Sequence, residues 1–496
     1  MSFLDVLQEC RQSGIRLAAR QGRLLVDGAG GNLTAALRER LSAHKAEILA
    51  FLGGETANAA PRLQPVAGAD DYPLSFSQQR LWFIDQLEHG SVEYNIPTAF
   101  RLRGALDREA LVAALNAIVA RHAVLRTRFA LKDGAPVQIV RDVAAFVPYE
   151  TDLSALQPAV RDAELLRLAD AEAQRPFDLA NDALLRCTLI RLGDDEHAVL
   201  FTVHHIAADG WSMGLLVKEF VALYGAFAQG GADPLPPLPI QYGDYAHWQR
   251  TAHGGGLLDE ALNYWQQRLA GLPALHDLPL DRPRPARQNF SAQRHARWLD
   301  RATLDGLRTF AKAGGATLFM ALQSAFAALL SRWSGQRDIV IGTPTAGRDQ
   351  PETAGLIGFF NNTLVCRYVV DSGDSAQALL AQGRCVALDA FTHQHAPFDL
   401  LVETLRPERS LAYNPLCQIK FVLQNHDGGA LELPGLVLEP VGKGGERVHF
   451  DLDLTASEGE NGLQLSWTYK EELFDAASIE RLAQAYELLL RQWLAR

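Results

Sequence analysis

A short polar run near the middle of the chain has the composition of a proton-transfer site. Residues 204–212 read HHIAADGWS and follow an apolar run, AVLFTV, at residues 198–203. Imidazole is the side chain best suited to move a proton near neutral pH, and a buried strand would hold it firmly. Two histidines followed by Asp and Gly at these spacings are expected by chance only about 0.002 times in such a chain. We therefore interpret this run as a functional motif.

The residues of this motif have distinct expected roles. A strand that ends in two histidines presents one imidazole to a cleft and packs the other, and we predict that His205 is the presented ring and His204 the packed one. If a local carbonyl holds one nitrogen of His205, the other can accept a proton from an amine or hydroxyl nucleophile, worth about 10² to 10⁴ in rate. Gly210 would let a substrate chain approach the backbone. The alternative is two satisfied core histidines at a strand end.

Asp209 has two possible partners. It could orient His205 directly, as the aspartate of a triad does. It could instead form a buried ion pair with an arginine that stiffens the turn. We favour the ion pair, because Asp209 and His205 share one tight turn in which a relay geometry is difficult.

Other catalytic chemistries have less support in the sequence. No serine or cysteine nucleophile is assigned, and Gly-Lys-Ser/Thr is absent, so ATP hydrolysis is not indicated. The two histidines in residues 393–395 (HQH) could suggest a metal pair. No further carboxylate or histidine accompanies them at ligand spacing, so we expect no metal site. We expect no directly bound cofactor either. What remains is acyl transfer without a covalent enzyme intermediate, in which the protein holds two substrates together.

Composition limits the class of protein. A chain of 496 residues with 48% hydrophobic and 21% charged residues indicates a soluble globular protein of two large units, and a net charge of -11 argues against a nucleic-acid partner. Five scattered cysteines without a Cys-x-x-Cys pair are typical of a reducing cytosol. Asp5 and Glu9 interrupt any signal-peptide core, and the apolar stretch at residues 318–333 is too short to span a bilayer. We expect a cytoplasmic monomer without a membrane partner.

Residues 1–54 are predicted to form a small α/β unit with a β-hairpin. Residues 3–10 have apolar side chains at helical spacing, and residues 15–19 and 23–26 have strand patterns around a Gln-Gly turn. A second helical segment follows a cap at Asn32 or Thr34. Such a unit has little core but offers an edge strand, so we predict peptide capture by strand addition, the alternative being a cap without a function of its own. Four basic side chains would favour an acidic partner tail: Arg16, Arg20, Arg23 and Lys45.

The rest of the chain is predicted to form two α/β lobes. Residues 55–70 have the Ala, Pro and Gly content of a linker, and a Pro-rich stretch at residues 233–239 separates a first lobe, 71–236, from a second, 237–496. Each lobe mixes amphipathic helices with buried strands. The expected elements are helices at residues 107–122, 317–334 and 479–496, and strands at residues 136–140, 184–192, 338–342 and 416–423.

From about Tyr72 to its end the chain resembles the condensation domains of nonribosomal peptide synthetases, members of the chloramphenicol acetyltransferase-like family. The resemblance rests on ordered segments, the last two matching loosely: residues 75–83 (SFSQQRLWF), 121–129 (RHAVLRTRF), 204–210 (HHIAADG), 242–248 (YGDYAHW), 357–363 (IGFFNNT), 393–399 (HQHAPFD) and 409–416 (RSLAYNPL). Asn361 stands where the family usually has Val. On this reading the histidines of residues 393–395 are family positions and not metal ligands.

The resemblance implies a V-shaped pseudodimer with the active site in a tunnel between the lobes. Carrier-bound donor and acceptor would enter on phosphopantetheine arms from opposite faces. It assigns catalysis to His205 and a mainly structural role to Asp209, with Arg348 as the expected arginine partner. Asn425 would line the tunnel near the reacting carbonyl.

The same resemblance bears on subtype and on the N-terminal unit. Trp211 and Ser212 depart from the Asp-Gly-Val-Ser-Trp of epimerization relatives, and cyclization relatives replace the histidines by aspartates, so condensation is favoured. The overall pattern looks closer to the type that takes an L-configured or achiral donor end. Residues 1–54 resemble the β-hairpin docking domains that capture the C-terminal tail of an upstream assembly-line protein.

These observations predict a condensation enzyme of a nonribosomal peptide or hybrid polyketide assembly line. Its donor would be an acyl or peptidyl thioester on an upstream carrier protein with an acidic C-terminal tail. Its acceptor would be an amine or hydroxyl, on a carrier or a free molecule, giving an amide or an ester, with chain release as one outcome. A freestanding enzyme is favoured over a piece of a larger synthetase. A noncatalytic recruitment module is the alternative, although such relatives usually lose the motif histidines and this chain keeps both.

Overall fold

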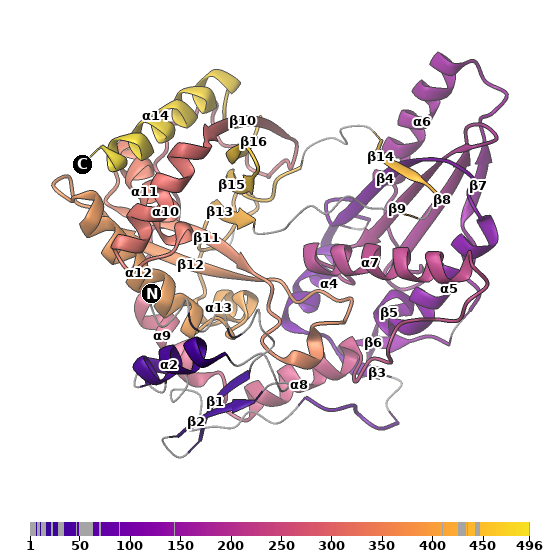
Figure 1. The fold of residues 1–496 in the computed structure, drawn as a ribbon, viewed down its shortest axis with the longest axis horizontal. Coiled ribbons are helices and arrows are strands. Elements are labelled where there is room, and N and C mark those ends of the chain that lie inside the picture. Colours follow the sequence, from indigo (N-terminus) through magenta and orange to yellow (C-terminus); the bar gives the residue numbers. More distant parts are fainter. Residues whose placement is uncertain are drawn as a thin grey trace. The chain divides into compact units, whose positions relative to one another are not determined.

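The computed structural model places most of the chain in two compact units (Figure 1). It describes residues 6, 10, 16–20, 23–27, 34–45, 47–48, 63–68, 71–88, 90–142, 144–408, 410–424, 433, 435–441 and 447–495. One unit comprises residues 1–62 with 254–257, and the other comprises residues 63–253 with 258–496. Each unit is described by itself.

The N-terminal unit contains the predicted hairpin and helix. β1 (Arg16–Arg20) pairs antiparallel with β2 (Arg23–Asp27), Arg20 lying opposite Arg23. α2 (Ala35–Ala43) begins after Thr34, whose hydroxyl accepts the Leu37 N–H at 3.2 Å and so satisfies one of the free donors of the first turn. The predicted hairpin is confirmed, and of the two predicted caps Thr34 is the one used.

The larger unit contains two main sheets, of which the first carries the histidine motif. Its strand order is β14-β4-β9-β8-β7, with these bounds: β4 (Asn95–Arg103), β7 (Tyr149–Asp152), β8 (Leu185–Arg191), β9 (Glu196–His204) and β14 (Val437–Pro440). β9 is the central strand. Val199 and Phe201 pack on one face with α5 (Arg108–Arg121) and α7 (Gly210–Phe227), whereas Leu200 packs on the other with α6 (Pro158–Ala173). Burial on both faces explains the continuous apolar run before the histidines.

The second main sheet packs against four long helices. Its order is β10-β16-β15-β13-β11-β12, with these bounds: β10 (Ala292–Asp300), β11 (Asp338–Thr345), β12 (Asn362–Val369), β13 (Ile419–Gln424), β15 (Leu452–Gly459) and β16 (Gly462–Lys470). The covering helices are α10 (Arg301–Ala313), α11 (Leu318–Ser334), α12 (Ala376–Thr392) and α14 (Ala476–Leu494). The alternation along β15 and β16 puts apolar residues under these helices and polar ones, such as Asp453 and Ser466, on the other face.

The remaining elements complete the larger unit. A three-stranded sheet has the order β3 (Asp71–Pro73), β6 (Ala135–Val140) and β5 (Thr127–Lys132). The remaining α-helices are α4 (Phe76–Glu88), α8 (Tyr242–Gly254), α9 (Asp259–Arg268) and α13 (Phe398–Leu405), and short 3₁₀ turns lie at Ala123–Arg126 and Pro351–Thr353. The predicted helices and strands are present, with ends shifted by a few residues.

Segments from the second half of this unit join the sheet and the core of the first half. β14, from late in the chain, pairs antiparallel with β4 and extends the first sheet. Leu356, Ile357, Phe359 and Phe360 also join the core built around β9, α5 and α7. A lobe is therefore not simply a continuous stretch of sequence, and the boundary between residues 236 and 237 stays a prediction.

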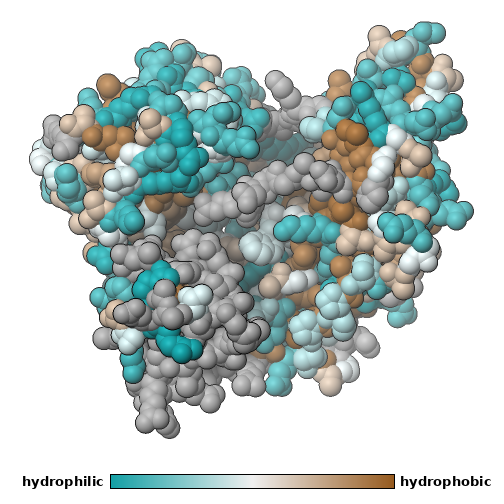
Figure 2. Space-filling model, viewed as in Figure 1, coloured by the Kyte–Doolittle hydropathy of each residue, from teal (hydrophilic) through white to brown (hydrophobic). Residues whose placement is uncertain are grey.

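Three observations concern the surface, the helices and the thiols. Figure 2 shows a mostly hydrophilic face, with hydrophobic residues gathered mainly on the lobe that carries β4 and β9. Among the described residues no single helix is long and apolar enough to cross a membrane; α10 and α11 meet that test only jointly, with a 97° bend between them. All five cysteines are free thiols, and Cys385 alone of these is exposed.

Candidate active site

The histidine motif forms the connection between the central strand and a helix. His204 is the last residue of β9, and α7 begins at Gly210. The backbone N–H of His205 donates to the Tyr94 carbonyl at 2.8 Å, and that of Ala207 donates to the His204 carbonyl at 2.9 Å. The turn between strand and helix is therefore held by backbone hydrogen bonds from inside the motif and from the segment before β4.

His204 is the packed histidine, as predicted. Its residue is 3% exposed, and its Nδ1 accepts the Ile206 backbone N–H at 3.2 Å. The ring meets Phe177 edge-on, with centroids 5.6 Å apart. Burial lowers the pKa of His204 to about 3, with smaller contributions from His205 and Arg186. A neutral ring whose Nδ1 is occupied in this way supports the turn.

His205 faces a less enclosed environment. The residue is half-buried, and its ring lies edge-on to Phe359 at 4.7 Å between centroids. Its Nδ1 is buried and makes no hydrogen bond of good geometry, whereas Nε2 is not sealed from solvent and has no partner among the described residues. Burial lowers the pKa of His205, and the backbone at His205 and Ala208 and the Asp209 charge offset part of this. The result is a neutral imidazole with one reachable nitrogen.

These buried imidazoles predict a loss of stability in mild acid. In the unfolded chain a histidine protonates near pH 6.5, whereas folded His204 remains neutral to about pH 3. Between those values the unfolded chain binds the extra proton, so His204 should lower the free energy of unfolding by about 1.4 kcal/mol per pH unit below 6.5. Urea unfolding at pH 7.5 and 5.5 measures this. His204→Leu should show a shallower pH dependence, and equal slopes would contradict the assignment.

Asp209 anchors the motif through its own hydrogen bonds. Within the described residues, its carboxylate makes no hydrogen bond to the His205 ring. It is the N-cap of α7: Oδ1 accepts the Ser212 N–H at 2.8 Å, and Oδ2 accepts the Phe360 N–H at 3.0 Å. The Arg348 guanidinium lies 3.5 Å from Oδ1, and the Asp209 and Arg348 side chains are 2% and 4% exposed. The structure thus brings the predicted ion-pair partners together in a buried position.

Arg348 and Ser212 connect this cap to the segment that carries Phe359. Arg348 donates to the Ser212 hydroxyl and to the Leu356 carbonyl, both at 2.8 Å, and its guanidinium lies 4.1 Å above the Phe360 ring. The Ser212 hydroxyl in turn donates to the Gly358 carbonyl at 2.7 Å. Because these bonds join α7 to residues 356–360, they position Phe359 beside His205.

Residues 210–214 read GWSMG and satisfy the Gly-x-Ser-x-Gly pattern of serine hydrolases, which the expectation of no serine nucleophile overlooked. The structure argues against a nucleophile here. Ser212 is completely buried, and its hydroxyl is bonded to Gly358 and Arg348. The serine hydroxyl therefore holds α7 and residues 348 and 358 together.

The second sequence motif, residues 121–129, also contacts residues 356–360. His122 Nδ1 accepts the Ile357 N–H at 3.2 Å, while its Nε2 lies 2.7 Å from a Glu219 carboxylate oxygen. Arg121 donates to the other Glu219 oxygen at 3.0 Å. Interactions with His122 and Arg121 lower the pKa of Glu219 despite its burial. The Tyr242 hydroxyl, from the fourth motif, donates to the Phe359 carbonyl at 2.7 Å. Motifs far apart in sequence thus converge on residues 356–360.

The other predicted site residues have mixed outcomes. Trp211 is 45% exposed, and its indole N–H donates to the Ala354 carbonyl at 3.4 Å. A side chain at Gly210 would meet nothing within 4 Å, so open space lies beside it. Asn425 lies outside the described residues. Lys45 is exposed at the end of the α2 segment. The three arginines belong to the hairpin strands, and their side chains lie outside the described part of the structure: Arg16, Arg20 and Arg23.

Three residues near His205 were not singled out from sequence. Arg80 of α4 forms an ion pair with Asp399 of α13 at 2.8 Å. Each residue lies in one of the family motifs, but neither was given a role. Tyr94 precedes β4, and its carbonyl holds the backbone of His205. His449 stacks on Tyr94 with ring centroids 5.1 Å apart. The opposite charges of Arg80 and Asp399 could have predicted their pairing from the sequence. No feature of the sequence around His449 indicates its position.

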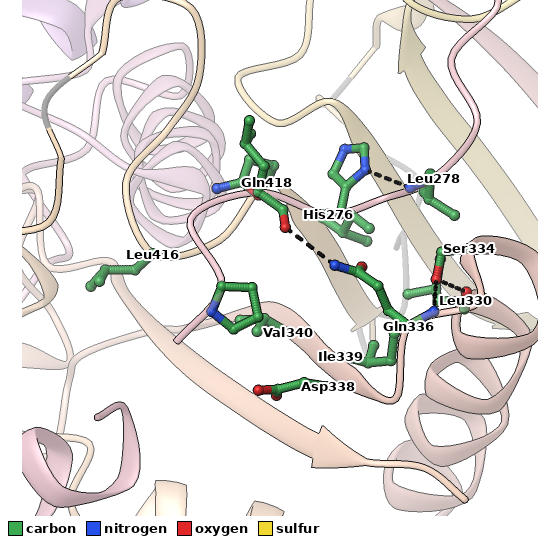
Figure 3. Close-up of a pocket in the computed structure, with 13 residues that line it drawn as sticks. His276, Leu278, Leu330, Ser334, Gln336, Asp338, Ile339, Val340, Leu416 and Gln418 are labelled. Carbon is green, nitrogen blue, oxygen red and sulfur yellow. Dashed lines mark hydrogen bonds between the residues drawn. The ribbon is translucent and has the colours of Figure 1, made fainter. Parts of the chain in front are cut away.

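In the described part of the chain no metal cluster lies at the motif, and the pocket drawn in Figure 3 lies elsewhere. No group of three or more His, Cys, Asp or Glu side chains within the described ranges could hold a metal ion. Figure 3 shows a pocket beside the second sheet. In it the Gln336 N–H donates to the Ser334 hydroxyl, and the Leu278 N–H donates to the His276 ring. None of its lining residues belongs to the histidine motif. The motif and the residues that surround it therefore remain the candidate site.

Comparisons with known proteins find relatives over most of the chain. Residues 68–496 match the family described as Condensation domain, and residues 5–53 match the TubC N-terminal docking domain. The chain is 44% identical over 446 residues to a linear gramicidin synthase protein of Brevibacillus parabrevis, covering 90% of the chain and 6% of that protein. It is 44% identical over 422 residues to phosphinothricin tripeptide synthetase PhsC of Streptomyces viridochromogenes, covering 84% of the chain and 39% of PhsC. The chain thus spans well under half the length of these relatives.

Solved structures show the same fold. The X-domain from teicoplanin biosynthesis superposes with a TM-score of 0.79 at 29% identity, covering 88% of this chain and 97% of that one. The condensation domain of the monacolin K polyketide synthase MokA superposes with a TM-score of 0.74 at 22% identity, covering 86% and 98%. The predicted two-lobed α/β fold is confirmed.

Proposed function

The chain belongs to the condensation-domain family, and from this premise we propose that it transfers an acyl or peptidyl group from a carrier-protein thioester to an amine or hydroxyl. The observation that carries the proposal is the reachable Nε2 of His205, on a turn that backbone bonds and the Asp209 cap hold in place. Condensation domains bind no cofactor of their own, and the phosphopantetheine arm belongs to the carrier.

In the proposed reaction His205 is the general base. Its Nε2 accepts the proton of the acceptor N–H or O–H as the acceptor attacks the thioester carbonyl carbon. The tetrahedral adduct then collapses: the carbon–sulfur bond breaks, the carbonyl reforms, and the proton on His205 passes to the departing sulfur. A new amide or ester and a free carrier thiol result. A lowered pKa suits this role, because His205 starts neutral at physiological pH.

The support around His205 is consistent with a fixed base. Asp209, Arg348 and Ser212 hold α7 against residues 356–360, so the imidazole and Phe359 keep one relative position. Fixing the base and both substrates turns a bimolecular reaction into an effectively intramolecular one. His204, Trp211 and Gly210 are proposed to shape the turn, and Asn425 to line the tunnel.

Intact-protein mass spectrometry tests the reaction. A carrier protein loaded in turn with aminoacyl and fatty acyl groups is incubated with this chain and a panel of amines, alcohols and aminoacyl carriers. We expect one donor to leave its carrier and appear on an acceptor as an amide or ester. Failure of every pair, with the donor remaining on its carrier, would contradict the proposal.

Residues 5–53 match a docking domain, and carrier proteins are therefore the expected partners. We propose that the β1–β2 hairpin captures an acidic C-terminal tail of the upstream carrier protein by strand addition, with the hairpin arginines and Lys45 supplying charge complementarity. The acceptor is a second carrier or a free small molecule. A cytoplasmic monomer in which residues 71–236 and 237–496 form the lobes is part of the same proposal.

Deletion of residues 1–54 tests the docking role. The truncated chain should use a tailed carrier with an apparent KM raised about tenfold or more, because a tethered second contact raises the effective concentration of the donor. Its kcat at saturating donor should stay unchanged. The matched control is the same carrier without its tail, on which the full and truncated chains should be equal. An unchanged KM for the tailed carrier would contradict the docking assignment.

A second candidate is a recruitment module without catalysis. It is favoured by one observation, the similarity to an X-domain that has been solved in complex with OxyB from teicoplanin biosynthesis, at 30% identity and a TM-score of 0.79. The same mass spectrometry distinguishes the two functions. Recruitment predicts partner binding that survives His205→Ala and no acyl transfer with any donor.

A further inference from the structure

A second imidazole lies against the segment that holds His205. His449 is stacked between two aromatic rings, with Tyr94 at 5.1 Å and an 11° interplanar angle, and Phe290 at 5.1 Å and 59°. Tyr94 is the residue whose carbonyl accepts the His205 backbone N–H at 2.8 Å. One residue therefore connects the two histidines, although they are far apart in the chain.

Hydrogen bonds of the two preceding residues fix the position of His449. Two residues earlier, Arg447 donates to the Val92 carbonyl and to the Glu93 carboxylate, both at 3.0 Å. The Val448 N–H donates to the Phe290 carbonyl at 3.0 Å. Residues 447–449 thus contact residues 92–94, and these contacts hold the imidazole in one place. A group in direct contact with substrate needs such preorganisation.

The ring of His449 has hydrogen-bonding capacity that the protein does not use. Within the ranges described, neither ring nitrogen has a hydrogen-bond partner, and neither is among the sealed, unsatisfied polar atoms. The residue itself is only partly buried. Its nitrogens are therefore not sealed from solvent. Buried polar groups are normally satisfied, so an accessible and unpaired nitrogen in a fixed ring is available to a ligand.

Chemistry restricts what this ring can do. Burial lowers the pKa of His449 to about 3, with further contributions from His205 and Lys420, so it is a very weak base. A neutral imidazole still carries one N–H donor, and such a ring can polarise a carbonyl. Two backbone donors that adjoin the histidine motif are already used: the N–H groups of Ser212 and Phe360 bond to Asp209. Donation is therefore the role that remains for His449.

We propose that the N–H of His449 donates a hydrogen bond to the carbonyl oxygen of the donor thioester and stabilises the oxyanion formed when the acceptor attacks. The inference rests on the proposed acyl transfer. His205 takes the proton from the acceptor, and His449 keeps its own proton throughout and binds the oxygen as negative charge develops there. When the adduct collapses the carbonyl reforms and this hydrogen bond weakens. Both imidazoles are then required, with different tasks.

Three variants separate donation from packing. His449→Phe keeps a ring between Tyr94 and Phe290 but has no donor, and should lower kcat by about 10² to 10³ with little change in the donor KM. His449→Gln replaces the ring by a side chain with an N–H donor and should stay within about tenfold of wild type. His253→Phe is the matched control, since that histidine meets Phe76 edge-on at 5.5 Å, and should leave kcat unchanged.

The assay uses acetyl, octanoyl and alanyl thioesters of N-acetylcysteamine and the carrier-bound donor, with the acceptor that wild type uses. Wild-type activity in His449→Phe would overturn the inference, as would equal losses in the Phe and Gln variants or a change confined to KM. Thermal unfolding of each variant shows whether it is folded. If His449→Phe is not folded, His449→Gln tests the inference: retained kcat supports it, and lost kcat overturns it. No transfer by wild type contradicts the proposed function itself, an outcome distinct from the other three.

Discussion

Replacement of His205 by alanine is expected to lower the rate of acyl transfer by about 10² to 10⁴. The physical reason is that its Nε2 is a reachable ring nitrogen on a fixed turn, and the proposed mechanism assigns it the acceptor proton. Single-turnover transfer from a loaded carrier, at saturating donor and acceptor, measures this loss. Because burial lowers the pKa of His205, the wild-type rate should also fall only below pH 6.5, where the base becomes protonated.

The neighbouring histidine gives the matched comparison for this experiment. His204→Leu removes an imidazole from the same turn but from its packed side, since His204 is 3% exposed. We expect it to cost stability while the folded fraction retains more activity than the His205 variant does. A His205→Ala enzyme within threefold of wild type would contradict the general-base role. Equal losses in both variants would show that the turn as a whole, and not one base, matters.

Breaking the Asp209–Arg348 pair should have the largest effect on folding. Arg348→Met leaves the Asp209 carboxylate buried beside an apolar side chain, and removing one partner of a buried ion pair typically costs about 3 to 5 kcal/mol. The loss should also release residues 356–360, because Arg348 holds the Leu356 carbonyl and the Ser212 hydroxyl. Urea unfolding and the transfer rate would report the two consequences separately.

A double-mutant cycle distinguishes the pair from its individual residues. Asp209→Asn keeps the cap acceptor for the Ser212 N–H but removes the charge, so Asp209→Asn with Arg348→Met should cost less than the sum of the single variants. The exposed pair Arg337–Asp371, at 68% and 55% exposure, provides the surface control, and Arg337→Met should cost less than about 1 kcal/mol. A similarly small cost for Arg348→Met would refute the structural role of the buried pair.

Much of the local structure was predictable because its determinants are local. The apolar run at residues 198–203 indicates a strand buried on both faces, and β9 packs against helices on both. Thr317 precedes a long apolar helical segment and caps α11 with its hydroxyl on the Met320 N–H at 3.3 Å. Turn residues at 21–22 between two short strand patterns predict the hairpin. In each case neighbouring residues in the chain supply the whole signal.

The contacts between distant segments were less accessible. Arg348 was named as the partner of Asp209 only through a resemblance, and the bonds from Ser212 and His122 to residues 356–360 carry no pattern in the sequence. β14 pairs with β4 from the opposite half of the chain, so continuous stretches do not define the cores. Ser212 satisfies a hydrolase pattern, and its complete burial is what decides against that role.

The sequence by itself determined the identity of the chemical groups: two histidines at the end of a buried strand, an Asp-Gly turn, and a basic hairpin segment. It also determined the family, because many ordered motifs agree with it. The tertiary structure alone decided the state and surroundings of those groups. Burial keeps His204 neutral and packed, Asp209 turns away to Arg348 and the α7 cap, and His449 comes from more than 200 residues away to stack beside Tyr94. Side-chain type is a property of one position, whereas protonation, exposure and partnership depend on atoms brought together only by folding.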